Sequence, residues 1–161
     1  MRDLISNLNN LCSYLDNWYE INSGACCYVA YLIAKHLDKL SVNYKLVVYS
    51  REDKQQDKIE NEALFMELNR TSDTSITGDH TCFHYDLLVS NREINFISST
   101  HSRRYVISGI TSENIKWLYD KGDWNMDYDR KHNNYIERSI DKLFKDFQKN
   151  YQQRQCKKVL L

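Results

Sequence analysis

Proline is absent from the 161-residue chain, and glycine occurs only four times. The lack of proline excludes proline-rich linkers, and the length suggests one domain over residues 1–161. Apolar runs are short, and none approaches the roughly 18 residues of a membrane-spanning helix. Neither sign of charge is in excess, because 22 basic residues balance 22 acidic residues. This balance argues against a broad nucleic-acid-binding surface, so we expect no nucleic-acid partner and no membrane partner.

Cysteine is present in a small and odd number. The five residues are Cys12, Cys26, Cys27, Cys82 and Cys156. An odd count, a pair of adjacent cysteines and the lack of a secretory pattern at the N-terminus are typical of proteins that stay reduced. We therefore expect a cytoplasmic protein without a disulfide framework.

Helical periodicity marks both ends of the chain. Residues 4–19 predict an amphipathic first helix that covers a core, with Trp18 on its apolar face. A second apolar stripe predicts a helix over about residues 26–40. A third stripe predicts a last helix over residues 136–151, and the basic tail from about residue 152 is expected to be frayed and flexible.

Strand patterns occupy the middle of the chain. Residues 43–49 are rich in β-branched and aromatic side chains and predict a buried strand. Residues 81–89 and 93–98 predict a hairpin that turns at Asn91–Arg92, and residues 105–110 predict a further strand of the same sheet.

Two segments complete this outline. Residues 51–79 are expected to contain a short helix at 59–68. The segment is either a solvated insertion or a flap over a cleft. A helix is expected from residue 113, capped by Thr111 or Ser112 and ended by Gly122. Helices followed by antiparallel strands and then by further helices predict an α+β fold.

The strongest chemical signal is the cysteine pair that opens the second predicted helix. Gly24 precedes this pair, which consists of Cys26 and Cys27. A helix N-terminus stabilises negative charge, and the thiolate is the reactive form of cysteine. Cys26 lies near the middle of the apolar face and Cys27 at its margin. The pattern therefore favours Cys26 as a nucleophile, with Cys27 as the second choice.

A cysteine nucleophile needs a base and a group that orients the base, and the predicted hairpin offers both. His84 lies on a strand, which fixes its backbone and aims its ring. With a turn at Asn91–Arg92, Asn95 lies opposite Leu88 and on the same face as His84. We expect His84 to be the base and Asn95 the orienting residue. Three other polar residues are held in reserve for the orienting role: Asp86, Ser98 and Ser99.

These residues resemble the active-site segments of a known superfamily. Gly-x-Cys-x-x-x-Ala at a helix start resembles the nucleophile motif of papain-like and transglutaminase-like cysteine enzymes. A histidine on an alternating strand, followed by a short turn and Ile-Asn, resembles their histidine and third-residue segment. The resemblance covers about residues 20–100. It implies a papain-like core in which the nucleophile helix packs on an antiparallel sheet and further helices flank both.

The resemblance also implies roles for single residues. Cys26 matches the nucleophile, His84 the base and Asn95 the orienting residue. The chain differs from the superfamily after the nucleophile, where Cys27 stands at a position often held by tryptophan. It differs again upstream, where papain relatives have a glutamine. Asn22 lies in that region and is expected to donate to the oxyanion together with the backbone N–H of Cys26.

The sequence therefore predicts a cysteine hydrolase or acyltransferase. It would act on an amide or peptide bond through a thioester, with a peptide or protein substrate and no cofactor. A non-enzymatic interaction module of the same fold is an alternative. Its partner surface would consist of aromatic residues near the C-terminus: Trp117, Tyr119, Trp124, Tyr128 and Tyr135.

A small zinc-binding domain is the remaining alternative. His80, Cys82 and His84 alternate along the predicted strand and share one face, and Cys26 and Cys27 could complete a tetrahedral site. The spacing is not a recognised zinc motif, which makes this function the weakest of the three.

Overall fold

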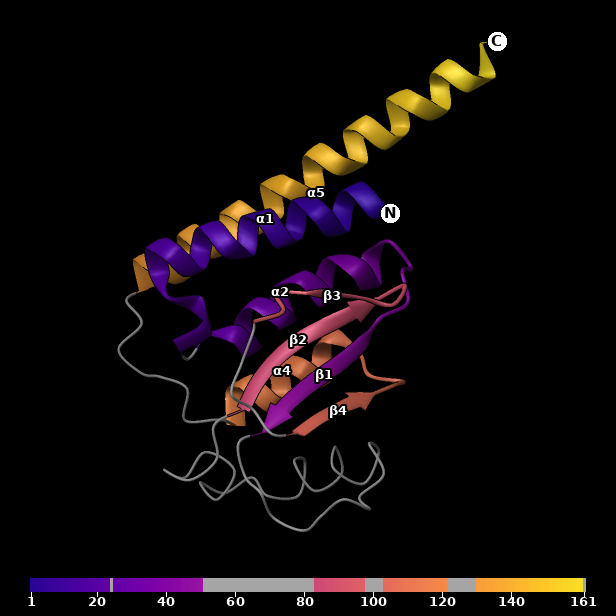
Figure 1. Cartoon of the computed structure of the whole chain (residues 1–161). Helices are drawn as coiled ribbons and strands as arrows, with labels where there is room; N and C mark the ends of the chain where they lie inside the picture. The colour runs from indigo at the N-terminus through magenta and orange to yellow at the C-terminus, as the bar shows by residue number, and fades with distance from the viewer. Residues whose placement is uncertain (24, 51–82, 98–102, 122–129, 161) are drawn as a thin grey trace.

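A computed structural model describes residues 1–23, 25–50, 83–97, 103–121 and 130–160 of the chain (Figure 1). The expected insertion at 51–79 and the expected helix stop at Gly122 lie outside these residues.

The described residues form helices and one small antiparallel sheet. The helical elements are α1 (Arg2–Tyr19), the short 3₁₀ helix η1 (Ile21–Ser23), α2 (Cys26–Lys39), α4 (Ser112–Lys121) and α5 (Arg130–Val159). The strands are β1 (Lys45–Ser50), β2 (Phe83–Val89), β3 (Arg92–Ile94) and β4 (Arg103–Ile107). They form a four-stranded sheet in the order β3-β2-β1-β4, with every neighbouring pair antiparallel. This arrangement confirms the predicted α+β class.

The two faces of the sheet have different characters. Successive side chains of a strand point to opposite faces of the sheet, and those of one face pack into the helical core. In Figure 1, α4 lies behind β1 and β2. This core face carries Leu46, Val48, Tyr85, Leu87 and Ile107. The other face carries the polar residues His84 and Asp86, which alternate with the core residues of β2. The sheet therefore separates an apolar core from a polar cluster.

The first helix follows its prediction closely but buries a different aromatic residue. The core residues of α1 recur in steps of three and four, and this series continues from Leu15 to Tyr19, which packs against the core. Trp18 lies three residues after Leu15 and is 70% exposed. The expectation that Trp18 covers the core is therefore wrong. Glu20 ends the helix in a left-handed conformation with φ 51°.

The last helix extends beyond its predicted end. Ile136, Ile140 and Phe144 form its buried stripe, as the apolar spacing predicts. The helix continues through the basic tail to Val159, and the side chains of residues 148–159 are exposed. No helix in the part of the chain that the structure describes is long and apolar enough to cross a membrane.

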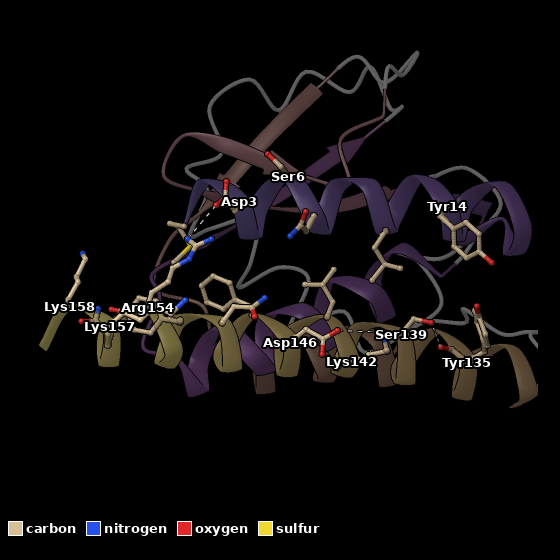
Figure 2. Close-up of a pocket in the computed structure, with 18 residues that line it drawn as sticks. Asp3, Ser6, Tyr14, Tyr135, Ser139, Lys142, Asp146, Arg154, Lys157 and Lys158 are labelled. Atoms are coloured by element: carbon tan, nitrogen blue, oxygen red, sulfur yellow. Dashed lines mark hydrogen bonds and ion pairs between the residues drawn. The ribbon is translucent and has the colours of Figure 1, made fainter. Parts of the chain in front are cut away.

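A cavity of about 960 Å³ lies between α1 and α5 (Figure 2). Leu11 and Tyr14 contribute to it from α1, and Leu143, Phe147 and Tyr151 contribute from α5. It contains none of the residues to which the sequence assigns catalytic chemistry.

The β2–β3 hairpin differs from its prediction in register. The turn consists of Ser90 and Asn91, whose φ angles are 49° and 63°. Two consecutive residues with positive φ are typical of the tight turns that match strand twist. Val89 then pairs with Arg92, so the predicted turn at Asn91–Arg92 is wrong. Continuing this register places residue 95 opposite Asp86 and not opposite Leu88.

The outer strands also end earlier than predicted. The third strand stops at Ile94, because Asn95 takes a φ of 69° and turns the chain out of the ladder. The last strand covers Arg103–Ile107 and lies beside β1, at the opposite edge of the sheet from β3.

Candidate active site

Cys26 is the first residue of α2, as the sequence predicts. The preceding Ala25 provides no side-chain cap. The first N–H groups of a helix have no partner within the helix and point outward, where they stabilise an anion. The Cys26 side chain is 2% exposed. Its sulfur therefore sits in a protected position in the electrostatic field of the helix N-terminus.

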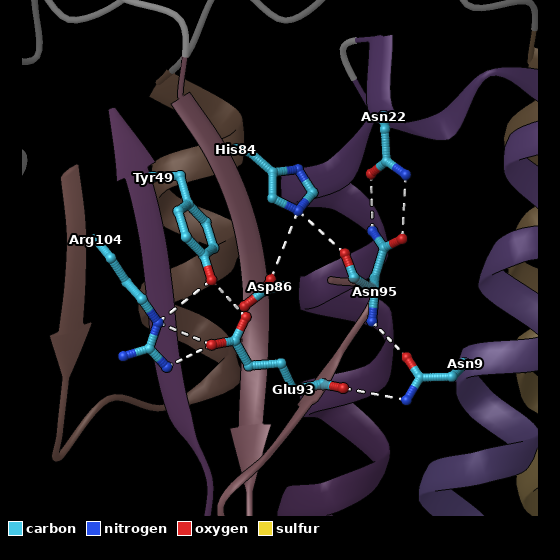
Figure 3. A network of polar contacts seen from close by, with 8 residues as sticks. All are labelled: Asn9, Asn22, Tyr49, His84, Asp86, Glu93, Asn95 and Arg104. Atoms are coloured by element: carbon cyan, nitrogen blue, oxygen red, sulfur yellow. Dashed lines mark hydrogen bonds and ion pairs between the residues drawn. The ribbon is translucent and has the colours of Figure 1, made fainter. Parts of the chain in front are cut away.

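His84 lies on β2 and is 2% exposed. Its Nε2 lies 3.1 Å from the carbonyl oxygen of Asn95 and 3.6 Å from Oδ2 of Asp86 (Figure 3). A carbonyl oxygen only accepts hydrogen bonds, so Nε2 carries the proton and donates it to Asn95. Nδ1 is then the nitrogen through which His84 can exchange a proton with a reacting group.

The thiol of Cys26 is a neighbour of His84 and raises the pKa of its imidazole. Burial alone lowers the pKa of His84. The neighbouring Asp86 and Cys26 outweigh burial and raise this pKa to about 10. The surroundings therefore favour a positively charged His84 at neutral pH, which is the partner that a thiolate needs.

Asn95 orients His84 through its backbone and not through its side chain. The Asn95 side chain forms a reciprocal amide pair with Asn22: Asn95 Nδ2 donates to Asn22 Oδ1 at 2.9 Å, and Asn22 Nδ2 donates to Asn95 Oδ1 at 3.2 Å. The backbone N–H of Asn95 donates to Asn9 Oδ1 at 2.8 Å. These contacts hold Asn95 in its turned conformation and aim its carbonyl oxygen at His84.

Asn22, the expected oxyanion donor, sits just before α2 in η1. Its backbone N–H donates to Asp16 Oδ1 at 2.9 Å. Each side-chain amide nitrogen carries two N–H bonds, and the amide pair with Asn95 uses one of them on Asn22. The structure thus brings Asn22 to the site as the hydrogen-bond partner of Asn95. The second N–H of the Asn22 amide does not take part in that pair.

Asp86, a reserve orienting residue in the sequence analysis, is the carboxyl group beside His84. It belongs to a polar network that spans all four strands (Figure 3). Tyr49 donates its hydroxyl to Glu93 Oε2 at 2.6 Å. Arg104 Nε donates to Glu93 Oε1 at 2.8 Å, and a second guanidinium nitrogen contacts the same oxygen. The two other reserve residues, Ser98 and Ser99, lie outside the described residues.

Cys27 is not suited to nucleophilic attack. It is fully buried, and its Sγ lies 3.9 Å from the carbonyl oxygen of Ile115. Burial, reinforced by the charges of Cys26 and Asp120, raises the pKa of Cys27 well above its ordinary value. The thiol therefore stays protonated, which favours Cys26 of the two neighbouring cysteines.

The zinc hypothesis receives no support from the described residues. His80 and Cys82 lie outside them. Within the described segments, no three histidine, cysteine, aspartate or glutamate side chains are grouped so that they could bind a metal ion.

Comparison of the chain with protein-family models, with curated proteins and with solved structures found no match in any of the three. The geometry of the site is therefore the basis for any assignment of function.

Sequence reasoning did not assign a role to several residues around His84. These residues are Asn9, Tyr49, Glu93 and Arg104. Strand alternation alone places Tyr49 and Glu93 on the polar face. The pairing of β1 with β4 brings in Arg104, which is opposite Tyr49. Nothing in the local sequence of α1 indicates that Asn9 contacts β3.

The raised pKa of His84 predicts a pH-dependent contribution to stability. The imidazole titrates near 6.5 in an unfolded chain and near 10 in the folded protein. The folded state therefore binds the proton more tightly, and this stabilisation is complete below pH 6.5 and is lost as the pH rises toward 10. Between pH 7 and pH 9, we expect wild type to lose about 1–3 kcal/mol more free energy of unfolding than His84→Gln.

Urea unfolding at the two pH values measures this difference. His132→Gln, the same change at an exposed histidine, serves as the control and should follow wild type. Equal losses in wild type and His84→Gln would show that folding does not raise the pKa of His84.

Proposed function

We propose that this protein is a cysteine hydrolase or acyltransferase with a papain-like core, which acts on an amide or peptide bond through a thioester. One observation carries the proposal. Cys26 lies at the N-terminus of α2 and raises the pKa of its neighbour His84, whose Nε2 is fixed by the Asn95 carbonyl and faces Asp86. This geometry pairs a nucleophile with an oriented base.

In the acylation step, the Cys26 sulfur attacks the carbonyl carbon of the substrate. The sulfur attacks as a thiolate, because the thiol proton is already held on Nδ1 of the His84 imidazolium. The imidazolium then gives this proton to the leaving nitrogen as the C–N bond breaks. The amine departs, and the acyl group remains on Cys26 as a thioester.

In the second step, water or an acceptor amine attacks the thioester carbon. His84 accepts a proton from the attacking group, the C–S bond breaks, and the proton returns to Cys26. With water the product is a carboxylic acid, and with an amine it is a new amide. His84 keeps its orientation in both steps, because the contact between Nε2 and Asn95 does not involve the reacting nitrogen.

The developing oxyanion would be stabilised at the same helix end. The backbone N–H of Cys26 is one donor. The Asn22 N–H bond that the Asn95 pair does not use is the second. Preorganised donors of this type typically contribute about 3–4 kcal/mol each to transition-state stabilisation.

The orienting role differs from the one that the resemblance implies. The Asn95 carbonyl accepts from His84, and the Asp86 carboxyl lies beside the same nitrogen. The proposed group is therefore Cys26, His84 and Asp86, with Asn95 acting through its backbone. The packing of α2 on an antiparallel sheet supports the papain-like assignment of the core.

The rate of alkylation of Cys26 as a function of pH tests the proposal. Iodoacetamide is small, and peptide mass mapping resolves each cysteine. We expect Cys26 to be labelled at pH 6 faster than Cys156, an exposed cysteine in α5 that serves as an internal reference. At this pH, well under 1% of an ordinary thiol is ionised, because its pKa is about 8.5. Cys27 should remain unlabelled in the folded protein.

A Cys26 that is labelled more slowly than Cys156 at pH 6, and that reacts only above pH 8.5, would contradict the proposal. That result would favour the interaction module. The cavity between α1 and α5 would then be the first region to probe for a partner, since Tyr14 and Tyr151 line it and are exposed.

A further inference from the structure

Two carboxyl groups, those of Asp86 and Glu93, meet on the polar face of the sheet. Glu93 pairs with Leu88, so it is the diagonal neighbour of Asp86 across the β2–β3 ladder. Diagonal neighbours lie within reach of long side chains. Figure 3 shows the two carboxyl groups turned toward each other between His84 and Arg104.

The hydrogen-bond donors around this pair are distributed unequally. Glu93 receives the Tyr49 hydroxyl at 2.6 Å and Arg104 Nε at 2.8 Å. Asp86 is 1% exposed, and among the described residues neither of its oxygens has a partner within hydrogen-bond distance and angle. Its nearest cationic neighbour, His84 Nε2, is 3.6 Å away.

When a buried and a partly buried carboxyl group are adjacent, the charge of one raises the electrostatic cost of ionising the other. The group with the better donors retains the negative charge, and this group is Glu93. The group without donors binds a proton more readily, and this group is Asp86. A protonated Asp86 can donate to Glu93, which satisfies one of its oxygens.

We propose that Glu93 is a positioning residue, which Arg104 and Tyr49 hold as a carboxylate, and which strengthens proton binding by Asp86 and so sets the pH range in which His84 faces a negative charge. The inference deepens the proposed function and depends on it, since the charge on His84 matters through the Cys26 reaction. The proposed arrangement differs from a simple triad of Cys26, His84 and Asp86, because a second carboxylate, that of Glu93, affects the protonation of Asp86.

The titration behaviour of the pair agrees with this geometry. Burial is the largest influence on Asp86 and raises its pKa. The neighbouring His84 lowers the pKa of Asp86, the charge of Glu93 raises it, and the result is about 7. Burial also raises the pKa of Glu93, but hydrogen bonds from Tyr49 and Arg104 outweigh burial and lower it.

Every element around Asp86 contributes to this balance. The facing groups in the described residues are Tyr49 on β1, His84 on β2, Glu93 on β3, Arg104 on β4 and Cys12 on α1. Burial raises the pKa of Cys12 to about 12, so this thiol is neutral. Arg104 is then the permanent positive charge in the cluster, and it contacts Glu93.

The state of Asp86 has a chemical consequence for His84. When Asp86 is protonated, the imidazolium lacks a negative charge beside Nε2 and releases its proton more readily to a leaving amine. When Asp86 is ionised, the imidazolium is stabilised and becomes a weaker acid. Glu93 thus determines the pH range over which His84 can act as the acid of the acylation step.

The test is a titration of the Asp86 side-chain carboxyl carbon and of the His84 ring by NMR in wild type and in Glu93→Gln. We expect the Asp86 midpoint to fall by at least one pH unit in the variant, because the neighbouring charge is gone. The step that Asp86 ionisation causes in the His84 ring shifts should move by the same amount. Glu137→Gln is the control. It removes the α5 carboxylate that pairs with Lys35 of α2, and it should change neither midpoint.

A second variant keeps the test decisive if Glu93→Gln fails to fold. Arg104→Gln removes the donors that hold Glu93 as a carboxylate, so the two carboxyl groups compete for one proton and the Asp86 titration should split into two steps with a changed midpoint. Unchanged Asp86 midpoints in both variants would overturn the inference. Unchanged midpoints together with rapid alkylation of Cys26 would overturn the role of Glu93 alone. Shifted midpoints with an unreactive Cys26 would overturn the proposed function.

Discussion

Cys26→Ala is expected to abolish the burst of p-nitrophenol that wild type releases from p-nitrophenyl acetate. This ester is activated enough to acylate a thiolate without specific recognition, so it reports on the nucleophile before a natural substrate is known. The burst measures transfer of one acetyl group to the protein, and mass spectrometry should find that group on Cys26. Without the sulfur no thioester can form, and the burst disappears.

Three further variants show which chemistry the loss reflects. His84→Ala should slow acetylation by roughly 100- to 10,000-fold, the usual contribution of a general base. Cys27→Ala and Cys156→Ala should retain the burst, because one thiol is held protonated by burial and the other lies on exposed α5. A burst that survives in Cys26→Ala and disappears in Cys27→Ala would move the nucleophile by one residue. Circular dichroism on each variant confirms that the fold is intact.

Phe144→Ala is expected to lower the free energy of unfolding by about 3–5 kcal/mol, the usual cost of removing a buried aromatic side chain. Phe144 is 1% exposed on α5, and its ring stacks on His36 of α2 with centroids 4.4 Å apart. His36 Nε2 also lies 2.6 Å from Asp141 Oδ1. The variant therefore removes an aromatic contact between α5 and α2, the helix that carries Cys26.

Urea unfolding at pH 7 measures this effect, with Lys145→Ala as the matched control. Lys145 is the next residue along α5 and is exposed, so its loss should change the free energy of unfolding by less than about 0.5 kcal/mol. A Phe144→Ala variant that loses less than about 1 kcal/mol would show that the α2–α5 contact is not a principal source of stability.

The sequence was sufficient to predict the elements that carry the proposed nucleophile and the proposed base. The apolar stripe of α2 is long, and the structure begins this helix at Cys26, as predicted. Strand alternation predicted that His84 and Asp86 share a face. Both patterns are local, because each depends on the periodicity of a single element.

The register of the hairpin could not be read in the same way. A turn with positive φ at two residues is usually signalled by Asn-Gly or Asp-Gly, whereas this chain uses Ser90 and Asn91. Because neither turn residue is a glycine, the sequence predicts a turn at Asn91–Arg92 equally well. The error of one residue in the turn moved the predicted partner of Asn95 from Asp86 to Leu88.

The carboxyl pair depends on contacts between elements that are distant in the sequence. Glu93 becomes a carboxylate with strong donors only because β1 supplies Tyr49 and β4 supplies Arg104. The strand order β3-β2-β1-β4 brings these residues together across the sheet. No local pattern encodes that order, so Asp86 remained one of several reserve residues in the sequence analysis.

The two-residue turn between β2 and β3 has a consequence for how this protein can evolve. Side chains alternate between faces along β3, so inserting or deleting one residue in the turn would exchange those faces. Glu93 would then enter the apolar core, and Ile94 would face His84. The amino acids at Ser90 and Asn91 are therefore open to substitution by other residues that tolerate positive φ, whereas the length of the turn is constrained by the chemistry beside it.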